Sequence, residues 1–229
     1  MIDLAKYVGR FKVIYADPAW EYEGDPDKPQ AAGKHYNTMS YEELKALPVR
    51  QLIDDPGVIC VWATGPKLHL GVDLIRDWGF HYRGIGYIWV KTTNAGKIIE
   101  GQGIRPSFTK PTTELILIGS TEPEGRTLPI YTESQGQLIF APRPGGIHSR
   151  KPEEARWRIE ELFGDVPKLE MFARAKYPGW EAWGLESDKP MPAIDAESPK
   201  LKARLEREAE LASQRELLSL MDLLPQEEF

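Results

Sequence analysis

The chain has 229 residues, a formal net charge of -6 and one cysteine, Cys60. This length suffices to bury a substantial core, the single cysteine excludes a disulfide framework within the chain, and the acidic balance argues against generic nucleic-acid binding by charge alone. We expect a cytoplasmic protein, because no signal peptide is recognised at the N-terminus and no run approaches the roughly 20 apolar residues of a membrane span.

Six short apolar runs predict β-strands, and they alternate with helical patterns, which is typical of an α/β domain. Several runs are apolar at nearly every position, as expected for a mostly parallel sheet that helices cover on both faces. In chain order the predicted strands are residues 11–16, 57–63, 86–91, 114–119, 137–141 and 168–173.

Three helices are predicted between these strands. Residues 40–43 read Ser-Tyr-Glu-Glu, the spacing of a capping box, and predict a helix through Leu47 that Pro48 stops. Apolar residues at helical spacing predict a second helix over 68–78, and a third follows Pro152 up to Gly164.

The remaining segments suggest how the chain is organised. Residues 21–39 and 92–113 are long and polar, so we interpret them as lids over a site. Residues 188–200 have the composition of a linker, and 201–225 show the apolar spacing of a C-terminal helix. We therefore expect a domain over 1–187, followed by the linker and by a helix that packs on the body or on a second copy. No His and Cys spacing predicts a metal site.

The first strand runs directly into Asp17-Pro18-Ala19-Trp20. One interpretation is a strand end with a helix-capping aspartate and a turn proline. The other is chemical, because ligands of open α/β sheets collect beyond the carboxyl ends of the strands. Proline fixes its own φ and restricts the residue before it, so a carboxylate and the Pro18 carbonyl can stand side by side.

These two acceptors match the two N–H donors of a planar exocyclic amine, and Trp20 offers a flat surface for its ring. The lone pair of such an amine is delocalised into the ring. Holding both hydrogens favours rehybridisation of the nitrogen, which stabilises the transition state of a methyl transfer more than the ground state.

The tetrapeptide resembles the Asp/Asn-Pro-Pro-aromatic signature of amino-methyltransferases that act on adenine N6 or cytosine N4. Further segments resemble the MT-A70-like adenine-N6 methyltransferases, from about Val13 to Glu186, and most of all the compact bacteriophage or prophage DNA enzymes. These segments are HYNTMS (35–40), WGF (78–80), IWVK (88–91), TELILIG (113–119), HSRKP (148–152), LEMFAR (169–174) and GWEAWG (179–184).

The resemblance implies a Rossmann-like sheet with a permuted motif order, in which the catalytic motif precedes the cofactor motif. It implies S-adenosylmethionine as methyl donor and adenine in DNA as acceptor, as in restriction-modification enzymes. The target base would have to be flipped out or single-stranded. RNA adenine-N6 methylation and a catalytically inactive nucleic-acid-binding subunit of the same fold stay open as alternatives.

The resemblance also assigns roles to individual residues. The catalytic residues would be Asp17, Pro18 and Trp20. The donor would be bound by Asp17, Lys151, Phe172, Arg174 and Glu186, and the substrate by Tyr36, His35, Glu114, Arg105 and Lys110. Two positions depart from the family pattern: Ala19 replaces a second proline, and Leu185 stands where an asparagine is common.

Overall fold

The computed structural model describes residues 4–21, 38–99, 108–109, 111–144, 150–191 and 206. The chain divides into two compact units, Met1–Lys189 and Pro190–Phe229. Only residues 190, 191 and 206 of the second unit are described. The predicted linker and C-terminal helix therefore lie almost entirely outside the described residues, and the domain boundaries stay a prediction.

Seven strands of the described residues form one sheet in the order β5-β3-β4-β2-β1-β6-β7. β4 is antiparallel to its neighbours β2 and β3, and the other four neighbouring pairs are parallel. This confirms a mostly parallel sheet. The strands are β1 (Phe11–Ala16), β2 (Ile53–Ala63), β3 (His81–Thr92), β4 (Thr113–Ser120), β5 (Leu138–Pro142), β6 (Lys168–Met171) and β7 (Glu181–Trp183).

Three strand boundaries differ from the sequence prediction by two residues or more. β3 begins at His81 rather than at residue 86, and its register against β4 is irregular on both sides of Gly84, whose φ of 124° suits only glycine. β6 ends at Met171 because Phe172 has a φ of 62° and leaves the β region. β2 starts four residues early at Ile53, which pairs with Phe11. β7, three residues long, is too short for its pattern to be recognised.

The three predicted helices are confirmed as α1 (Tyr41–Lys45), α2 (Leu68–Asp77) and α3 (Glu154–Phe163). The capping box of α1 is present: the Ser40 hydroxyl accepts from the Glu43 backbone N–H, and the Glu43 carboxylate accepts from the Ser40 N–H. Short 3-10 turns span Ala5–Tyr7, Val49–Leu52 and Gly65–Lys67. α1 ends two residues before Leu47, and α3 starts two residues after Pro152.

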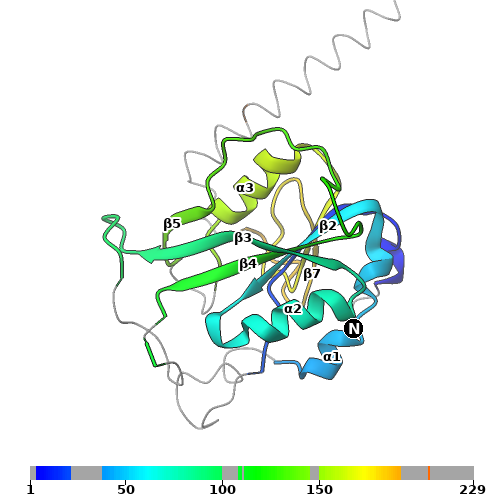
Figure 1. The fold of residues 1–229 in the computed structure, drawn as a ribbon, viewed down its shortest axis with the longest axis horizontal. Coiled ribbons are helices and arrows are strands. Elements are labelled where there is room, and N and C mark those ends of the chain that lie inside the picture. Colours follow the sequence, from blue (N-terminus) through cyan, green and yellow to red (C-terminus); the bar gives the residue numbers. More distant parts are fainter. Residues whose placement is uncertain are drawn as a thin grey trace, which may run out of the picture. The chain divides into compact units, whose positions relative to one another are not determined.

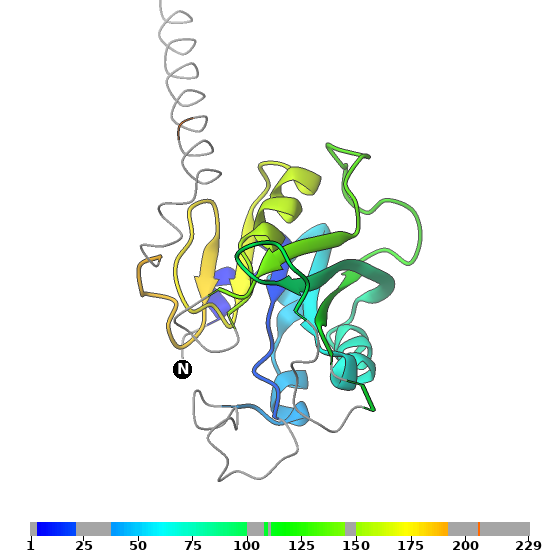
Figure 2. The same ribbon diagram turned by 90° about the vertical axis from the view of Figure 1, so that its left-hand side faces the viewer.

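α2 and α3 cover opposite faces of the sheet, and Figures 1 and 2 show the strands between them. On the α2 face a core cluster joins Ile14 and Ala16 to Leu74 and Ile75 of the helix. Because side chains alternate along a strand, Tyr15 points to the other face, where the Arg156 guanidinium of α3 lies 5.6 Å from its ring.

This arrangement decides what meets at the carboxyl end of β1. The carboxyl ends of β2, β6 and β3 lie at the same edge of the sheet as that of β1. The beginning of β4 lies there too, because β4 is antiparallel to its neighbours. Side chains from widely separated parts of the sequence can therefore meet beyond Ala16.

Candidate active site

The site begins at the corner formed by Asp17, Pro18 and Trp20, where the chain leaves the sheet. Asp17 directly follows the buried strand β1. Its side chain is 24% exposed. Pro18 is buried, and its carbonyl oxygen accepts a hydrogen bond of 2.8 Å from the Trp20 backbone N–H. A carbonyl oxygen has two lone pairs, so this bond leaves the Pro18 carbonyl able to accept a second donor.

Lys151 reaches Asp17 from the segment before α3. The Lys151 ammonium nitrogen lies 2.9 Å from Asp17 Oδ2 and 3.3 Å from Glu114 Oε2, and the side chain is only 9% exposed. The same nitrogen stands 5.4 Å from the centre of the Trp62 ring. Two residues that the sequence assigned to different ligands, Lys151 and Glu114, are thus brought into direct contact.

Glu114 reaches this edge because β4 runs against its neighbours, so that the start of β4 meets the ends of the parallel strands. Its Oε1 forms a 2.7 Å ion pair with the ammonium group of Lys91, near the end of β3. The sequence prediction gave Lys91 no role. A charged residue directly after the apolar run Ile88–Val90 was the signal that could have identified it.

The two carboxylates respond differently to this setting. Burial raises the pKa of Asp17, and the opposing effect of the Lys151 ammonium does not fully compensate. Burial also disfavours ionisation of Glu114, but Lys151 and Lys91 outweigh it and hold its pKa below the usual value. The site therefore combines one firmly ionised carboxylate with one that binds a proton more readily.

Aromatic side chains fix the floor of this corner. Trp20 is 4% exposed, belongs to the core cluster, and donates from its indole nitrogen to the Trp62 carbonyl at 3.4 Å. Trp62 donates in turn to the Tyr15 hydroxyl at 2.5 Å. Burial leaves little of the Trp20 ring accessible for stacking on a base, and that role stays a prediction.

The residues beyond β6 form a second side of the site. The Phe172 ring packs edge-on against Trp183 with centroids 5.5 Å apart, and the positive φ of Phe172 turns the chain at this point. The Ala173 N–H donates to the Trp183 carbonyl at 2.9 Å. Arg174 lies close enough to Asp17 to oppose the increase in its pKa.

Gly184 permits this turn by its lack of a side chain. A Cβ at this position would lie 2.5 Å from the Ala173 carbonyl oxygen and 2.9 Å from the Phe172 carbonyl carbon. Backbone atoms cannot rotate away as a side chain would. The last glycine of GWEAWG is therefore required by the close approach of two backbone segments.

We expect Gly184→Ala to lower the free energy of unfolding by about 1–3 kcal/mol, because the added methyl group must displace the Phe172–Ala173 backbone. Urea unfolding followed by tryptophan fluorescence measures the loss. Gly136→Ala is the matched control: nothing lies within 4 Å of a Cβ built there, and we expect a change below about 0.5 kcal/mol. Equal effects of the two substitutions would contradict this explanation.

Glu186 lies in the turn after β7, where its carboxylate pairs with the Lys189 ammonium on the surface. Leu185 beside it is 81% exposed, an unusual position for a leucine. Residues His35, Tyr36, Arg105 and Lys110, predicted to contact substrate, lie outside the described residues. Their roles stay predictions, as does the interpretation of their segments as lids.

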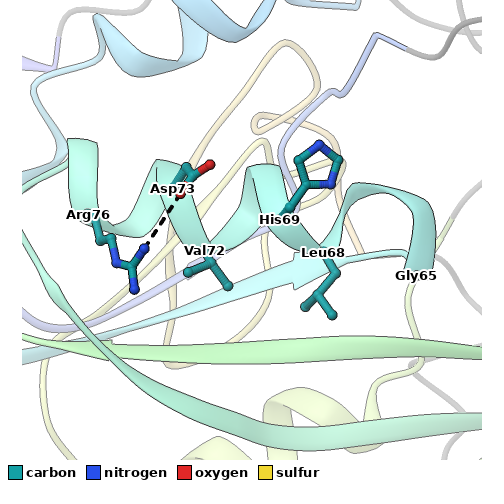
Figure 3. Close-up of a pocket in the computed structure, with 6 residues that line it drawn as sticks. All are labelled: Gly65, Leu68, His69, Val72, Asp73 and Arg76. Carbon is teal, nitrogen blue, oxygen red and sulfur yellow. Dashed lines mark ion pairs between the residues drawn. The ribbon is translucent and has the colours of Figure 1, made fainter.

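A groove elsewhere in the structure contains none of the predicted site residues. It follows α2, where Leu68 and Val72 point to the opposite side of the helix from His69 and Asp73, and Arg76 pairs with Asp73 at 3.7 Å (Figure 3). Across the described ranges, no group of three or more His, Cys, Asp or Glu side chains is placed to bind a metal. No helix in the described part of the chain is long and apolar enough to span a membrane.

The chain matches the family model MT-A70 over residues 11–186. The type II methyltransferase M.MunI of Mycoplasma sp. is 30% identical over 196 residues, which cover 77% of this chain and 78% of that protein. An N(6)-adenosine-methyltransferase MT-A70-like protein of Drosophila melanogaster is 32% identical over 183 residues, 79% of this chain. The N(6)-adenine-specific methyltransferase METTL4 of Homo sapiens is 27% identical over 203 residues, 81% of this chain.

The extent of these matches differs. This chain covers 28% of the Drosophila protein and 39% of human METTL4, whereas it covers most of M.MunI. The family model begins at Phe11, the first residue of β1, and ends at Glu186, just beyond β7, so it includes the whole sheet and the corner at Asp17. By this match the chain belongs to the MT-A70 family.

Proposed function

We propose that this protein transfers a methyl group from S-adenosylmethionine to the N6 amine of adenine in DNA. Adenine-N6 methylation is the activity in the names of the Drosophila protein and of human METTL4. DNA is favoured as substrate by the match to M.MunI, a type II methyltransferase, over most of both chains. A role in restriction-modification follows from the same match. The finer likeness to phage enzymes stays a prediction.

The observation that carries this proposal is the placement of Asp17 and the Pro18 carbonyl at the sheet edge where ligands of α/β proteins bind. Lys151 contacts Oδ2 of Asp17, so we assign Oδ1 to one hydrogen of the target amine. The Pro18 carbonyl takes the other. Ala19 does not remove either acceptor, because the Asp17 carboxylate and the Pro18 carbonyl do not belong to residue 19.

The side chains at this edge suit a zwitterionic donor. Lys151 and Arg174 supply cations for a carboxylate, and Asp17 and Glu114 supply anions for an ammonium or sulfonium group. We assign Phe172, whose ring packs against Trp183, to contact with the donor adenine, and Glu186 lies in the turn that follows β7. When bound, S-adenosylmethionine supplies the electrophilic methyl group.

The amine must release one proton once its nitrogen has gained a methyl group. Asp17 is suited to accept it at Oδ1, because burial raises the pKa of this carboxyl. Lys151 keeps the charge of Asp17 compensated while the carboxylate is ionised. The corner thus orients the amine before the transfer and takes the proton afterwards.

We further propose a Rossmann-like methyltransferase fold with permuted motif order. In its support, Asp17 follows the first strand, whereas Phe172 and Arg174 follow the sixth. A homodimer through the C-terminal helix is a separate proposal, which rests on the apolar spacing of 201–225 alone.

The proposal is tested with tritiated donor and matched DNA and RNA oligonucleotides, in single- and double-stranded form. We expect tritium in DNA, recovered as N6-methyladenine after digestion. Incorporation into RNA only would reject DNA as the substrate and favour the alternative suggested by the adenosine methyltransferase relative.

Leu185 is the residue that favours an inactive subunit, because the resemblance implies an asparagine there that bonds the donor ribose, and a leucine side chain cannot form that hydrogen bond. Titration calorimetry with S-adenosylmethionine separates this case. Heat of binding is expected for the enzyme. Its absence, together with no transfer to either nucleic acid, would support the inactive alternative.

A further inference from the structure

Four charged side chains of alternating sign form a continuous row at the candidate site. The ion pairs are Lys91–Glu114 at 2.7 Å, Glu114–Lys151 at 3.3 Å and Lys151–Asp17 at 2.9 Å. The residues come from β3, β4, the segment before α3 and the end of β1. Their side chains are between 9% and 24% exposed, so solvent screens these pairs less than it screens surface pairs.

The two inner members of the row are shared. Glu114 uses Oε1 for Lys91 and Oε2 for Lys151, and the Lys151 ammonium contacts both Glu114 and Asp17. An ammonium group has three N–H donors, so it can hold both carboxylates at once or move toward either. Its position depends on how strongly each carboxylate attracts it.

This sharing matters for Asp17. The Lys151 ammonium occupies Oδ2 of Asp17, while an incoming amine and the donor also need partners at this edge. If the Lys151 ammonium moves away from Asp17, Glu114 can serve as its counter-ion instead. Lys91 in turn draws on the same Glu114 carboxylate and so weakens its attraction for Lys151.

We propose that Lys91 is a positioning residue of this site: by competing for Glu114, it sets how closely Lys151 is held to Asp17. This inference rests on the proposed function for its catalytic meaning. The arrangement of charges itself is a property of the protein without ligands. Among the described ion pairs, Lys91 contacts Glu114 and not Asp17, so its effect on Asp17 passes through Glu114.

The charged groups that face Asp17 allow two substitutions to shift its pKa in opposite directions. They are Lys151, Glu114 and Arg174, and the buried Tyr15 lies two residues earlier on β1. Lys91→Met leaves Glu114 to Lys151 alone, draws the ammonium away from Asp17 and should raise the pKa of Asp17. Glu114→Gln removes the competing carboxylate, leaves Lys151 to Asp17 and should lower it.

The deciding measurement is a pH titration of the Asp17 carboxyl carbon by NMR in the full chain, assigned by its absence from Asp17→Ala. We expect the Asp17 midpoint to rise by about half a pH unit or more in Lys91→Met, and to fall by a similar amount in Glu114→Gln. Lys91→Arg keeps the positive charge and should leave the Asp17 midpoint at its wild-type value. The acid limb of the single-turnover methylation rate should move in the same directions.

A double variant separates positioning from a simple effect of charge. If Lys91 acts through Glu114, adding Lys91→Met to Glu114→Gln should produce no further shift of the Asp17 midpoint. Lys12→Met is the matched control, since Lys12 pairs with Asp54 at 2.9 Å near the amino ends of β1 and β2. It should leave the Asp17 midpoint unchanged.

The outcomes are distinguishable. Additive shifts in the double variant, or no shift in either single variant, would overturn the inference. The expected shifts without methyl transfer to any nucleic acid would keep the positioning role of Lys91 and reject the proposed function. Methyl transfer without the expected shifts would support the proposed function and reject the positioning role of Lys91.

Discussion

Replacing Asp17 by alanine is expected to lower the rate of methyl transfer on the order of 10³-fold, because the substitution removes an acceptor that holds the amine in the transition state. The fold should survive it. Lys151 keeps Glu114 as a partner at 3.3 Å. The loss should therefore appear in the rate and not in the yield of folded protein.

Asp17→Ala should also raise the melting temperature slightly at pH 8, where Asp17 of the wild type is ionised. Burial raises the pKa of Asp17 in the folded state, which means that folding disfavours its ionised form. This penalty is fully present above the folded-state pKa and disappears as the pH falls through it. The gain in melting temperature should therefore be larger at pH 8 than at pH 4, close to the ordinary pKa of an aspartate.

Single-turnover assays and thermal melts at the two pH values measure these effects. Asp54→Ala provides the matched control, because Asp54 also pairs with a lysine, Lys12, but at the opposite edge of the sheet. Its rate should equal that of the wild type. An Asp17→Ala rate within tenfold of the wild type would refute the mechanism in which the carboxylate orients the amine.

Among the substitutions considered, removal of Glu170, the buried partner of Arg156, should lower the free energy of unfolding most. Glu170 accepts two hydrogen bonds from the Arg156 guanidinium, at 2.7 and 2.6 Å, and the two side chains are 10% and 8% exposed. Burial disfavours the charge of Arg156, but Glu170 outweighs that effect and raises the pKa of the guanidinium above its usual value. Glu170 is therefore the main compensation for the buried charge of Arg156.

We expect Glu170→Ala to lower the free energy of unfolding by about 3–5 kcal/mol, since it leaves a buried charge uncompensated. Adding Arg156→Met should recover most of that loss, because an apolar side chain can replace a buried ion pair. Urea unfolding of the two single variants and the double variant gives the coupling energy.

The surface pair Arg126–Glu133 is the control for this cycle. Its nitrogen–oxygen distance is 2.8 Å, close to that of the buried pair, but the two side chains are 66% and 73% exposed. We expect Glu133→Ala to change the free energy of unfolding by less than about 1 kcal/mol. Similar losses from Glu133→Ala and Glu170→Ala would show that burial does not set the size of the effect.

The Arg156–Glu170 pair also connects the elements that carry the site. Glu170 lies two residues before Phe172, and Arg156 lies five residues after Lys151. Arg156 also stands 5.6 Å from the ring of Tyr15, two residues before Asp17. Loss of the pair should therefore disturb the relative placement of all three functional segments.

Much of the fold follows from local sequence signals. Apolar runs located six of the seven strands, and the capping box at Ser40–Glu43 and the glycines after α2 and α3 located the helix boundaries. The errors lie where local rules fail. β3 begins five residues before the predicted residue 86, because pairing with β4 extends the strand through Gly84. Phe172 ended a strand with a φ that its residue type disfavours.

The chemical content of the site could be read from the sequence alone: an acid, a proline and a tryptophan at the end of a buried strand, in an order of motifs that resembles one family. Which charges meet depends on how the strands are arranged in the sheet. Glu114 contacts Lys151 because β4 runs against its neighbours, and Lys91 contacts Glu114 because β3 and β4 are paired. Strand order and direction are set by contacts between segments far apart in the sequence, and a local run of residues does not specify which strands become its neighbours.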